Sequence, residues 1–279
     1  MSELKDYWNR LDTSGVDESF VNESLRSVTS RISRRQRWKT GLISLAVAIP
    51  IIGAGFTAVH NISHVEEPLL CYAQHGEHKT LTLEDGTSIT LNSGSSLTYF
   101  TNSDRGRRQV ILQGEARFEV THNPKRPFIV HTNSFDVEVL GTVFDVASFP
   151  EDSVQSVVLE SGSVKLITEG GKETFLKHGE KAEISKDGDV SVTAVNTSLY
   201  HNWTKGGYLF DRASFDDIVK YIERNYAVNV WVEDSPKFHN ASITARQDSP
   251  QSIQEFLSLM SKLIPGMRYS ISGQHVTIY

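Results

Sequence analysis

Two glutamates of this 279-residue chain have a spacing that could support chemistry. Glu115 and Glu119 fall on one face of a predicted strand, an arrangement that resembles the paired carboxylates of a glycosidase. In an extended strand, however, they lie about 13 Å apart, beyond the roughly 5 to 9.5 Å that such catalysis uses. We therefore expect a solvated strand face at this position.

The Gly141-Thr142 pair is a second candidate. A threonine hydroxyl can attack the preceding carbonyl where a turn is strained, giving an ester and then chain cleavage. The alternative is that Gly141 only supplies a backbone shape at a strand bend, with Thr142 as an ordinary strand residue. We favour the alternative, because the sequence shows no base that would activate Thr142.

No metal site and no cofactor are expected. The closest histidine pairs, His75 with His78 and His60 with His64, lack acidic or cysteine neighbours at convincing ligand spacing. The lone cysteine, Cys71, excludes an intramolecular disulfide and any multi-cysteine metal site, so we expect it to be structural. The net charge of -6 argues against direct nucleic-acid binding, because a phosphate-binding surface needs a basic excess.

An uncharged stretch points to a membrane. Residues 40–59 contain no charged side chain, and at about 1.5 Å per helical residue they span roughly 30 Å, the thickness of the hydrocarbon core. The preceding flank carries basic residues that no acid opposes: Arg31, Arg34, Arg35, Arg37 and Lys39. Because basic flanks stay in the cytoplasm, we expect a single-pass protein with residues 1–39 in the cytoplasm and the chain beyond residue 60 exported.

Two short amphipathic helices are predicted within residues 1–39. Apolar residues recur at helical spacing, first at Leu4, Tyr7, Trp8 and Leu11, and then at Val21, Leu25 and Val28. Two helices of this length bury too little surface to offset their ordering entropy, so another protein should cover their apolar faces. A helix lying on the bilayer is the alternative, which the basic end would also favour. Trp8 is far from the membrane in sequence and favours the protein partner.

The exported part is predicted to hold two folding units after a linker at residues 60–78. In residues 79–200, apolar residues alternate with period two between turns such as Asp85-Gly86 and Asp187-Gly188. This pattern predicts an all-β domain, either a sandwich, a barrel or a β-stack, and periodicity does not choose among them.

Residues 201–279 are predicted to form an α+β domain of two βαβ-like units. The two halves match at an offset of 35 residues, which pairs Ser214, the expected cap of the first helix, with Ser249, the expected cap of the second. Pro250 would then be the first residue of the second helix. The chain should close with a hairpin that turns at Ser272-Gly273.

Three segments, in order, resemble the core of the FecR-type transmembrane sigma-factor regulators. They are LEDGTSITLNSGSSLTYF from Leu83, VILQGEARFEVTHNPKRPFIVHT from Val110 and VEVLGTVFDVASF from Val137. The C-terminal part resembles the small domain that ends the Bacteroidota members, itself similar to the signalling (STN) domain of TonB-dependent outer-membrane transducers.

The resemblance implies an anti-sigma factor in the inner membrane. Residues 1–39 would bind an extracytoplasmic-function (ECF) sigma factor in the cytoplasm. The periplasmic FecR-like β domain (79–200) and STN-like domain (201–279) would receive a signal from a TonB-dependent transducer. Some family members also process themselves at a pair matching Gly141-Thr142. Because binding energy would carry this function, we expect no enzymatic activity.

The alternative from another class is a membrane-tethered periplasmic glycan-binding module or carbohydrate-active enzyme. It would require an exposed aromatic platform or a close pair of carboxylates on the β domain.

Overall fold

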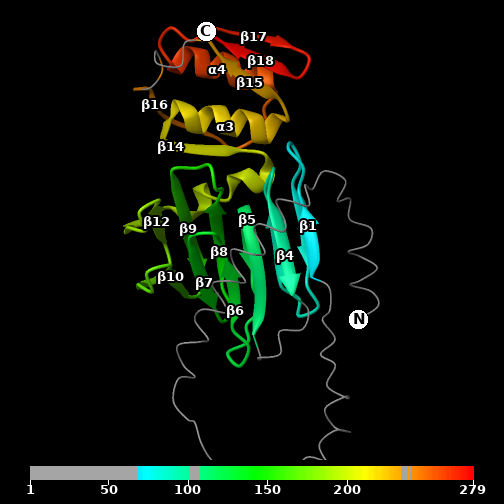
Figure 1. Cartoon of the computed structure of the whole chain (residues 1–279), viewed down its shortest axis with the longest axis vertical. Coiled ribbons are helices and arrows are strands. Elements are labelled where there is room, and N and C mark those ends of the chain that lie inside the picture. The colour runs from blue at the N-terminus through cyan, green and yellow to red at the C-terminus, as the bar shows by residue number, and fades with distance from the viewer. Residues whose placement is uncertain (1–67, 101–106, 234–237, 239) are drawn as a thin grey trace, which may run out of the picture.

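The computed structural model describes residues 68–100, 107–233, 238 and 240–279, which form two domains (Figure 1). The predicted cytoplasmic segment, the predicted membrane helix and residues 60–67 of the predicted linker lie outside these residues. Within the described part of the chain, no helix combines the length and the apolar content that a membrane crossing needs.

The first domain contains only strands. They are β1 (Leu69–Tyr72), β2 (Lys79–Thr82), β3 (Ser88–Leu91), β4 (Ser96–Phe100), β5 (Arg108–Glu119), β6 (Phe128–His131), β7 (Phe135–Val139), β8 (Val143–Ser148), β9 (Val154–Ser161), β10 (Val164–Thr168), β11 (Glu173–Leu176), β12 (Glu180–Ser185) and β13 (Val190–Ala194). The prediction of an all-β domain is confirmed.

The long strand β5 belongs to two sheets. Its first half lies in the order β1-β4-β5-β6-β7-β10-β11, and its second half in the order β2-β3-β5-β8-β9-β12-β13. The strand passes from one sheet to the other at Gly114, which has φ +107 and lies so close to Ser95 that a Cβ atom would clash with it. Two sheets that share one strand enclose a single core, so the domain is a sandwich.

The core of the sandwich comes from the predicted period-two positions. Residues such as Ile89, Leu112 and Val137 are almost completely buried, because alternate side chains of a strand point to the same face. Phe118 and Phe144, on neighbouring strands, stack with ring centroids 5.0 Å apart. Cys71 is fully buried in the same core, as expected for a structural residue.

The second domain follows two short 3-10 helices, η1 (Thr197–Leu199) and η2 (Asn202–Lys205). Its elements are β14 (Tyr208–Ser214), α3 (Phe215–Tyr226), β15 (Asn229–Val232), β16 (Ser242–Gln247), α4 (Ile253–Leu263), β17 (Tyr269–Ser272) and β18 (His275–Ile278). The predicted order of strands and helices and the closing hairpin are confirmed.

The two predicted βαβ-like units do not form separate sheets. Their first strands, β14 and β16, pair with each other, whereas their second strands, β15 and β17, lie on either side of β18. Both helices pack their apolar faces into the core between these sheets, with Ile218, Ile222 and Met260 fully buried.

The predicted start of the second helix is wrong by one turn. The N-cap of α4 is Ser252, not Ser249, and Pro250 precedes the helix. The reason is the capping box: Glu255 returns a hydrogen bond to Ser252, whereas a cap at Ser249 would have a serine in the same place. The capping boxes of α3 and α4 therefore match Ser214 with Ser252, not with Ser249.

Candidate functional site

The end of the sandwich meets α3 through charged side chains, and we call this contact the junction. The loop between β8 and β9 carries Glu151 and Asp152, and α3 carries Lys220 and Arg224 four residues apart, on one helix face. Arg224 Nη1 lies 3.0 Å from Glu151 Oε1 and 3.1 Å from Asp152 Oδ1, and Lys220 Nζ donates to the Glu151 carbonyl over 2.7 Å. The Arg224 guanidinium also lies 3.8 Å above the ring of Phe149.

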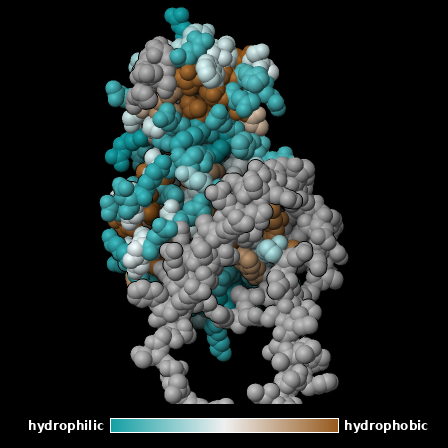
Figure 2. All heavy atoms as spheres, viewed as in Figure 1, coloured by the Kyte–Doolittle hydropathy of each residue, from teal (hydrophilic) through white to brown (hydrophobic). Residues whose placement is uncertain are grey.

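In Figure 1, β14 and α3 lie across the end of the sandwich, with α4 and the three-stranded sheet beyond them. In Figure 2, hydrophilic residues cover the visible face along the band where the two domains meet. This surface agrees with a contact made by ion pairs and hydrogen bonds at its margin.

Glu115 lies beside the junction. Its carboxylate accepts a hydrogen bond of 2.6 Å from Asn92 Nδ2, and burial raises its pKa to about 7, although Asn92 and the charge of Arg224 oppose the shift. The expectation of a solvated strand face is therefore right for Glu119, whose side chain is 57% exposed, and wrong for Glu115, which is half-buried near Arg224 of the second domain.

The turn between β1 and β2 also contacts the second domain. The Gly76 amide donates to the carbonyl of Arg224 over 2.8 Å. His78 packs edge-on against Trp203 of η2, with ring centroids 5.6 Å apart. Burial lowers the pKa of His78, so this ring is neutral at physiological pH. Both histidines are exposed; His78 contacts the segment that leads into the second domain, and His75 lies against Gly94 of the sandwich.

A second polar group lies on the outer face of the sandwich, and we call it the Arg117 cluster: Arg117, Glu119, Asp145, Glu160 and His201. Strand register builds it, because Arg117 faces Asp145 across β5 and β8. Arg117 Nη1 lies 3.0 Å from Asp145 Oδ2, and Nη2 lies 2.7 Å from Glu160 Oε2. Burial raises the pKa of the Asp145 carboxyl, against the opposing charge of Arg117.

His201 covers the Arg117 cluster from the segment between η1 and η2. Its Nδ1 lies 3.5 Å from Glu160 Oε2, too long for a well-formed hydrogen bond. Sequence reasoning missed this cluster, because Arg117, Asp145, Glu160 and His201 are far apart in the chain and share no motif. The register of β5, β8 and β9, together with the path of the chain at His201, brings them together.

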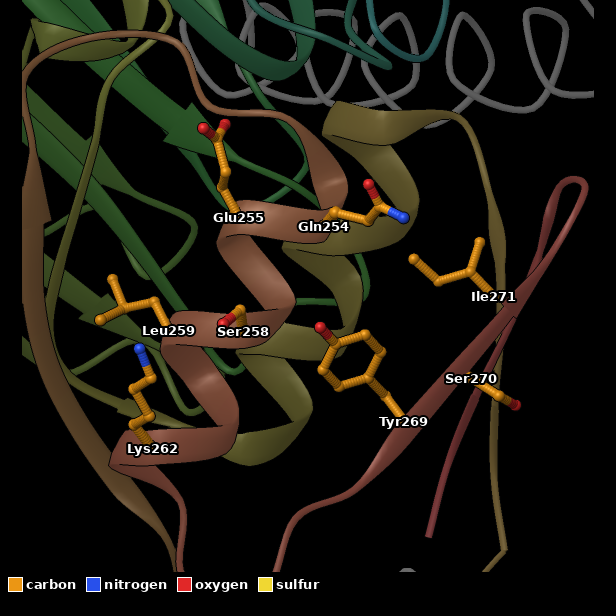
Figure 3. Close-up of a pocket in the computed structure, with 8 residues that line it drawn as sticks. All are labelled: Gln254, Glu255, Ser258, Leu259, Lys262, Tyr269, Ser270 and Ile271. Carbon is orange, nitrogen blue, oxygen red and sulfur yellow. The ribbon is translucent and has the colours of Figure 1, made fainter.

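A groove lies on the second domain, away from the junction (Figure 3). It has a volume of about 610 Å³ and runs between α4 and the edge strand β17. Its lining residues are Gln254, Glu255, Ser258, Leu259, Lys262, Tyr269, Ser270 and Ile271. Tyr269 and Ile271 point towards the helix and Ser270 points away, as alternation along a strand requires.

Within the described part of the chain, β18 is the one strand that pairs with β17. The other edge of β17 is therefore free to pair with a further strand. Arg268 and Tyr279 exchange two backbone hydrogen bonds next to the ladder, so the alternating pattern turns the backbone groups of Tyr269 and Ile271 away from β18. On the other edge of the same sheet, Trp231 of β15 is 70% exposed.

The Gly141-Thr142 pair, considered above for self-cleavage, lies directly before β8. A Cβ atom on Gly141 would clash with the backbone of His122, so a glycine is needed there for close approach. Thr142 is 3% exposed, and its hydroxyl donates to the Ser163 carbonyl over 2.9 Å. The Thr142 hydroxyl thus donates to a carbonyl oxygen and not to an activating base, which agrees with the favoured interpretation of Thr142 as an ordinary strand residue. Self-cleavage itself is not tested by these contacts.

The other predicted site residues lie outside the described part of the chain. They are the helix positions Leu4, Tyr7, Trp8, Leu11, Val21, Leu25 and Val28, and the basic flank Arg31, Arg34, Arg35, Arg37 and Lys39. Their roles in partner binding and in membrane topology stay predictions.

Comparison with known proteins agrees with this two-domain arrangement. Residues 71–165 match the family model described as FecR protein, and residues 207–278 match the model described as FecR, C-terminal. No curated protein sequence is significantly similar to the chain.

Two crystal structures of a "putative anti-sigma factor" from Parabacteroides distasonis ATCC 8503, at 1.65 and 2.50 Å resolution, share the fold. Both are 27% identical to this chain, with TM-scores of 0.70 and 0.71. The similarity covers 75% and 76% of this chain and 98% and 99% of the solved ones. With two matched regions that together span more than half of its length, the protein belongs to the FecR family.

Proposed function

We propose that the protein is an anti-sigma factor that holds an ECF sigma factor at the inner membrane until a periplasmic contact changes its state. The observation that carries this proposal is the pair of FecR matches, together with the similarity to nearly the whole length of a solved protein described as an anti-sigma factor. The sequence identity of 27% supports more than a shared fold.

The sigma factor would bind residues 1–39 in the cytoplasm. The proposed contacts are the apolar faces of the two predicted helices, centred on Trp8 and Leu11 in the first and on Leu25 and Val28 in the second. Each helix alone is too short to be stable in water, so folding and binding would be coupled. Residues 40–59 would carry the state of the periplasmic part across the membrane in one helix.

The periplasmic input would come from the signalling domain of a TonB-dependent outer-membrane transducer. We place its contact at the groove between α4 and β17. An extended segment of the transducer would add to the edge of β17 by hydrogen bonds to the backbone of Tyr269 and Ile271. Its side chains would enter the groove beside Leu259.

The junction would pass this contact on to the sandwich. Its ion pairs are partly exposed, with the Arg224 side chain at 14% and Asp152 at 20%. Pairs of this kind contribute roughly 0 to 1 kcal/mol each, so a bound partner can supply enough free energy to rearrange them.

The glycan alternative is not favoured. Asp145 and Glu160 are close, with ligand atoms within 4.8 Å of each other, but both bind Arg117 and Asp145 is nearly buried. A glycosidic bond could not enter between them, and catalytic pairs stand about 5 to 9.5 Å apart. The protein acts as a regulator through binding.

The proposal is tested by pull-down from detergent-solubilised membranes with residues 1–39 and residues 70–279 as separate baits. We expect the first bait to capture an ECF sigma factor and the second to capture a TonB-dependent transducer. Trp8→Ala with Leu11→Ala should abolish sigma-factor capture, because both side chains lie on the predicted apolar face. Asn9→Ala, on the polar side, is the control. Unchanged capture by the double variant would reject these contacts.

A further inference from the structure

Asp145, Glu160 and His201 converge from β8, β9 and the segment before η2. One potential ligand atom from each lies within 4.8 Å of the others. Nδ1 of His201 and Oε2 of Glu160 are 3.5 Å apart. Two ligands on a tetrahedral zinc ion, with bonds of about 2.1 Å, lie roughly 3.4 Å apart. The separation is thus too long for a good hydrogen bond and suits two ligands of one ion.

Two atoms of this group have no hydrogen-bond partner in the described part of the chain. They are Asp145 Oδ1 and His201 Nδ1, and both are inaccessible to solvent. Asp145 as a whole is 6% exposed. Buried polar atoms are nearly always paired, because leaving one unpaired costs roughly 1 to 3 kcal/mol. Asp145 Oδ2 is bound to Arg117, so its free oxygen is the one available to a ligand.

The charge balance of the Arg117 cluster also favours a bound cation. The carboxylates of Glu119, Asp145 and Glu160 share one guanidinium, at distances of 3.5, 3.0 and 2.7 Å. When all three are ionised, the cluster has an excess of two negative charges, which equals the charge of one divalent cation. Asp145 is the buried member of the three, so its negative charge is costly unless Arg117, an ion or a proton compensates it.

We infer that Asp145, Glu160 and His201 form a binding site for a divalent transition-metal ion, with zinc as the best match. One imidazole nitrogen and two carboxylate oxygens are ordinary zinc ligands, whereas magnesium and calcium prefer oxygen ligands alone. A water molecule would complete the tetrahedron. Arg117 would hold the two carboxylates in place through its own hydrogen bonds.

The position of His201 gives the site a structural consequence. The residue belongs to the segment that leads into the second domain, while Asp145 and Glu160 belong to the sandwich. A bound ion would therefore fasten the segment that leads into the second domain to β8 and β9. It would act at the opposite end of β9 from the junction, whose ion pairs hold α3.

The test uses the purified full-length chain, stripped of metal with a chelator and then dialysed. Isothermal titration calorimetry with ZnCl₂ should show one zinc ion bound per chain, and this binding should depend on His201. Zinc should also raise the unfolding temperature of the protein. His201→Gln and Asp145→Asn should each weaken this binding by at least about tenfold. His275→Gln, at an exposed histidine of β18, is the matched control and should bind as the wild type does.

Cobalt gives a second readout, because a tetrahedral cobalt site absorbs visible light and His201→Gln should remove that absorption. His201 is partly exposed, so this variant should fold even if Asp145→Asn does not. Zinc binding that persists in His201→Gln overturns the inference. So does the absence of binding, or binding that is lost only on replacement of His60, His64, His75 or His78.

Discussion

Arg224 of α3 and Asp152 of the β8–β9 loop join the two domains, with Nη1 lying 3.1 and 3.2 Å from the two carboxylate oxygens. The two residues are 72 positions apart in the chain. Their contact is the firmest of the junction, because the same guanidinium also binds Glu151 and stacks on Phe149.

Replacement of Arg224 by methionine should loosen the junction without unfolding either domain. The variant keeps much of the side-chain volume over Phe149 but removes the guanidinium from Glu151 and Asp152, leaving Asp152 only the longer contact of 3.7 Å with Lys220. We expect a loss of about 1 to 2 kcal/mol from the domain contact, because two partly exposed ion pairs are lost. Calorimetry should show it as a separation of the two domains' unfolding transitions.

Arg246→Met is the matched control for this experiment. Arg246 is 46% exposed, and among the described residues its ion pair is with Asp248, two residues away in the same domain. An exposed local pair contributes little to stability, so this variant should unfold as the wild type does. If both arginine variants behave alike, the junction does not depend on Arg224.

Glu115 should make stability depend on pH. Burial raises its pKa from 4.5 to about 7, so the folded protein holds the proton more tightly than the unfolded chain. This contribution to stability is complete below pH 4.5 and is lost as the pH rises to about 7. Glu115→Gln stays neutral and can still accept from Asn92. At pH 8 we expect it to be about 1 to 3 kcal/mol more stable than the wild type, with the difference vanishing near pH 4.5.

Thermal unfolding of both proteins at pH 4.5, 6, 7 and 8 measures this difference. Glu84→Gln, at an exposed position of the β2–β3 turn, is the control for loss of one negative charge. A Glu115→Gln variant that is less stable than the wild type at pH 8 would show that the carboxylate form is the one that the fold favours.

The strands of the sandwich could be predicted because the alternation of apolar and polar residues that specifies a strand lies within a few neighbouring positions. Leu81, Ile89 and Leu91 alternate with polar residues, and the structure buries all three. The closing hairpin was also readable, because Gly273 at its turn has φ +60, a conformation that side chains other than glycine rarely adopt. In each case a few neighbouring residues decide the structure.

The site residues could not be predicted because their partners are distant in the chain. The strand pattern places Glu115 on a solvated face, whereas in the structure it is half-buried, near Arg224 of α3. The Arg117 cluster depends on the register of β5, β8 and β9 and on the path of the chain at His201. Neither register nor domain docking leaves a signal in local periodicity.

A proline at Ile271 tests the proposed contact with the transducer. The backbone amide of Ile271 faces away from β18, so Ile271→Pro removes a donor that an added strand would use and breaks no hydrogen bond of the existing ladder. Transducer capture by residues 70–279 should fall at least about tenfold, because strand addition depends on main-chain hydrogen bonds.

Ile271→Val is the matched control, since it shortens the same side chain but keeps the amide. It should capture the transducer as the wild type does. Circular dichroism of both variants should match the wild type, because proline is tolerated in an edge strand whose amide points outward. If the proline and valine variants both capture the transducer as well as the wild type does, pairing at β17 is excluded. Equal loss in both would instead assign the contact to the side chain that Ile271 places in the groove beside α4.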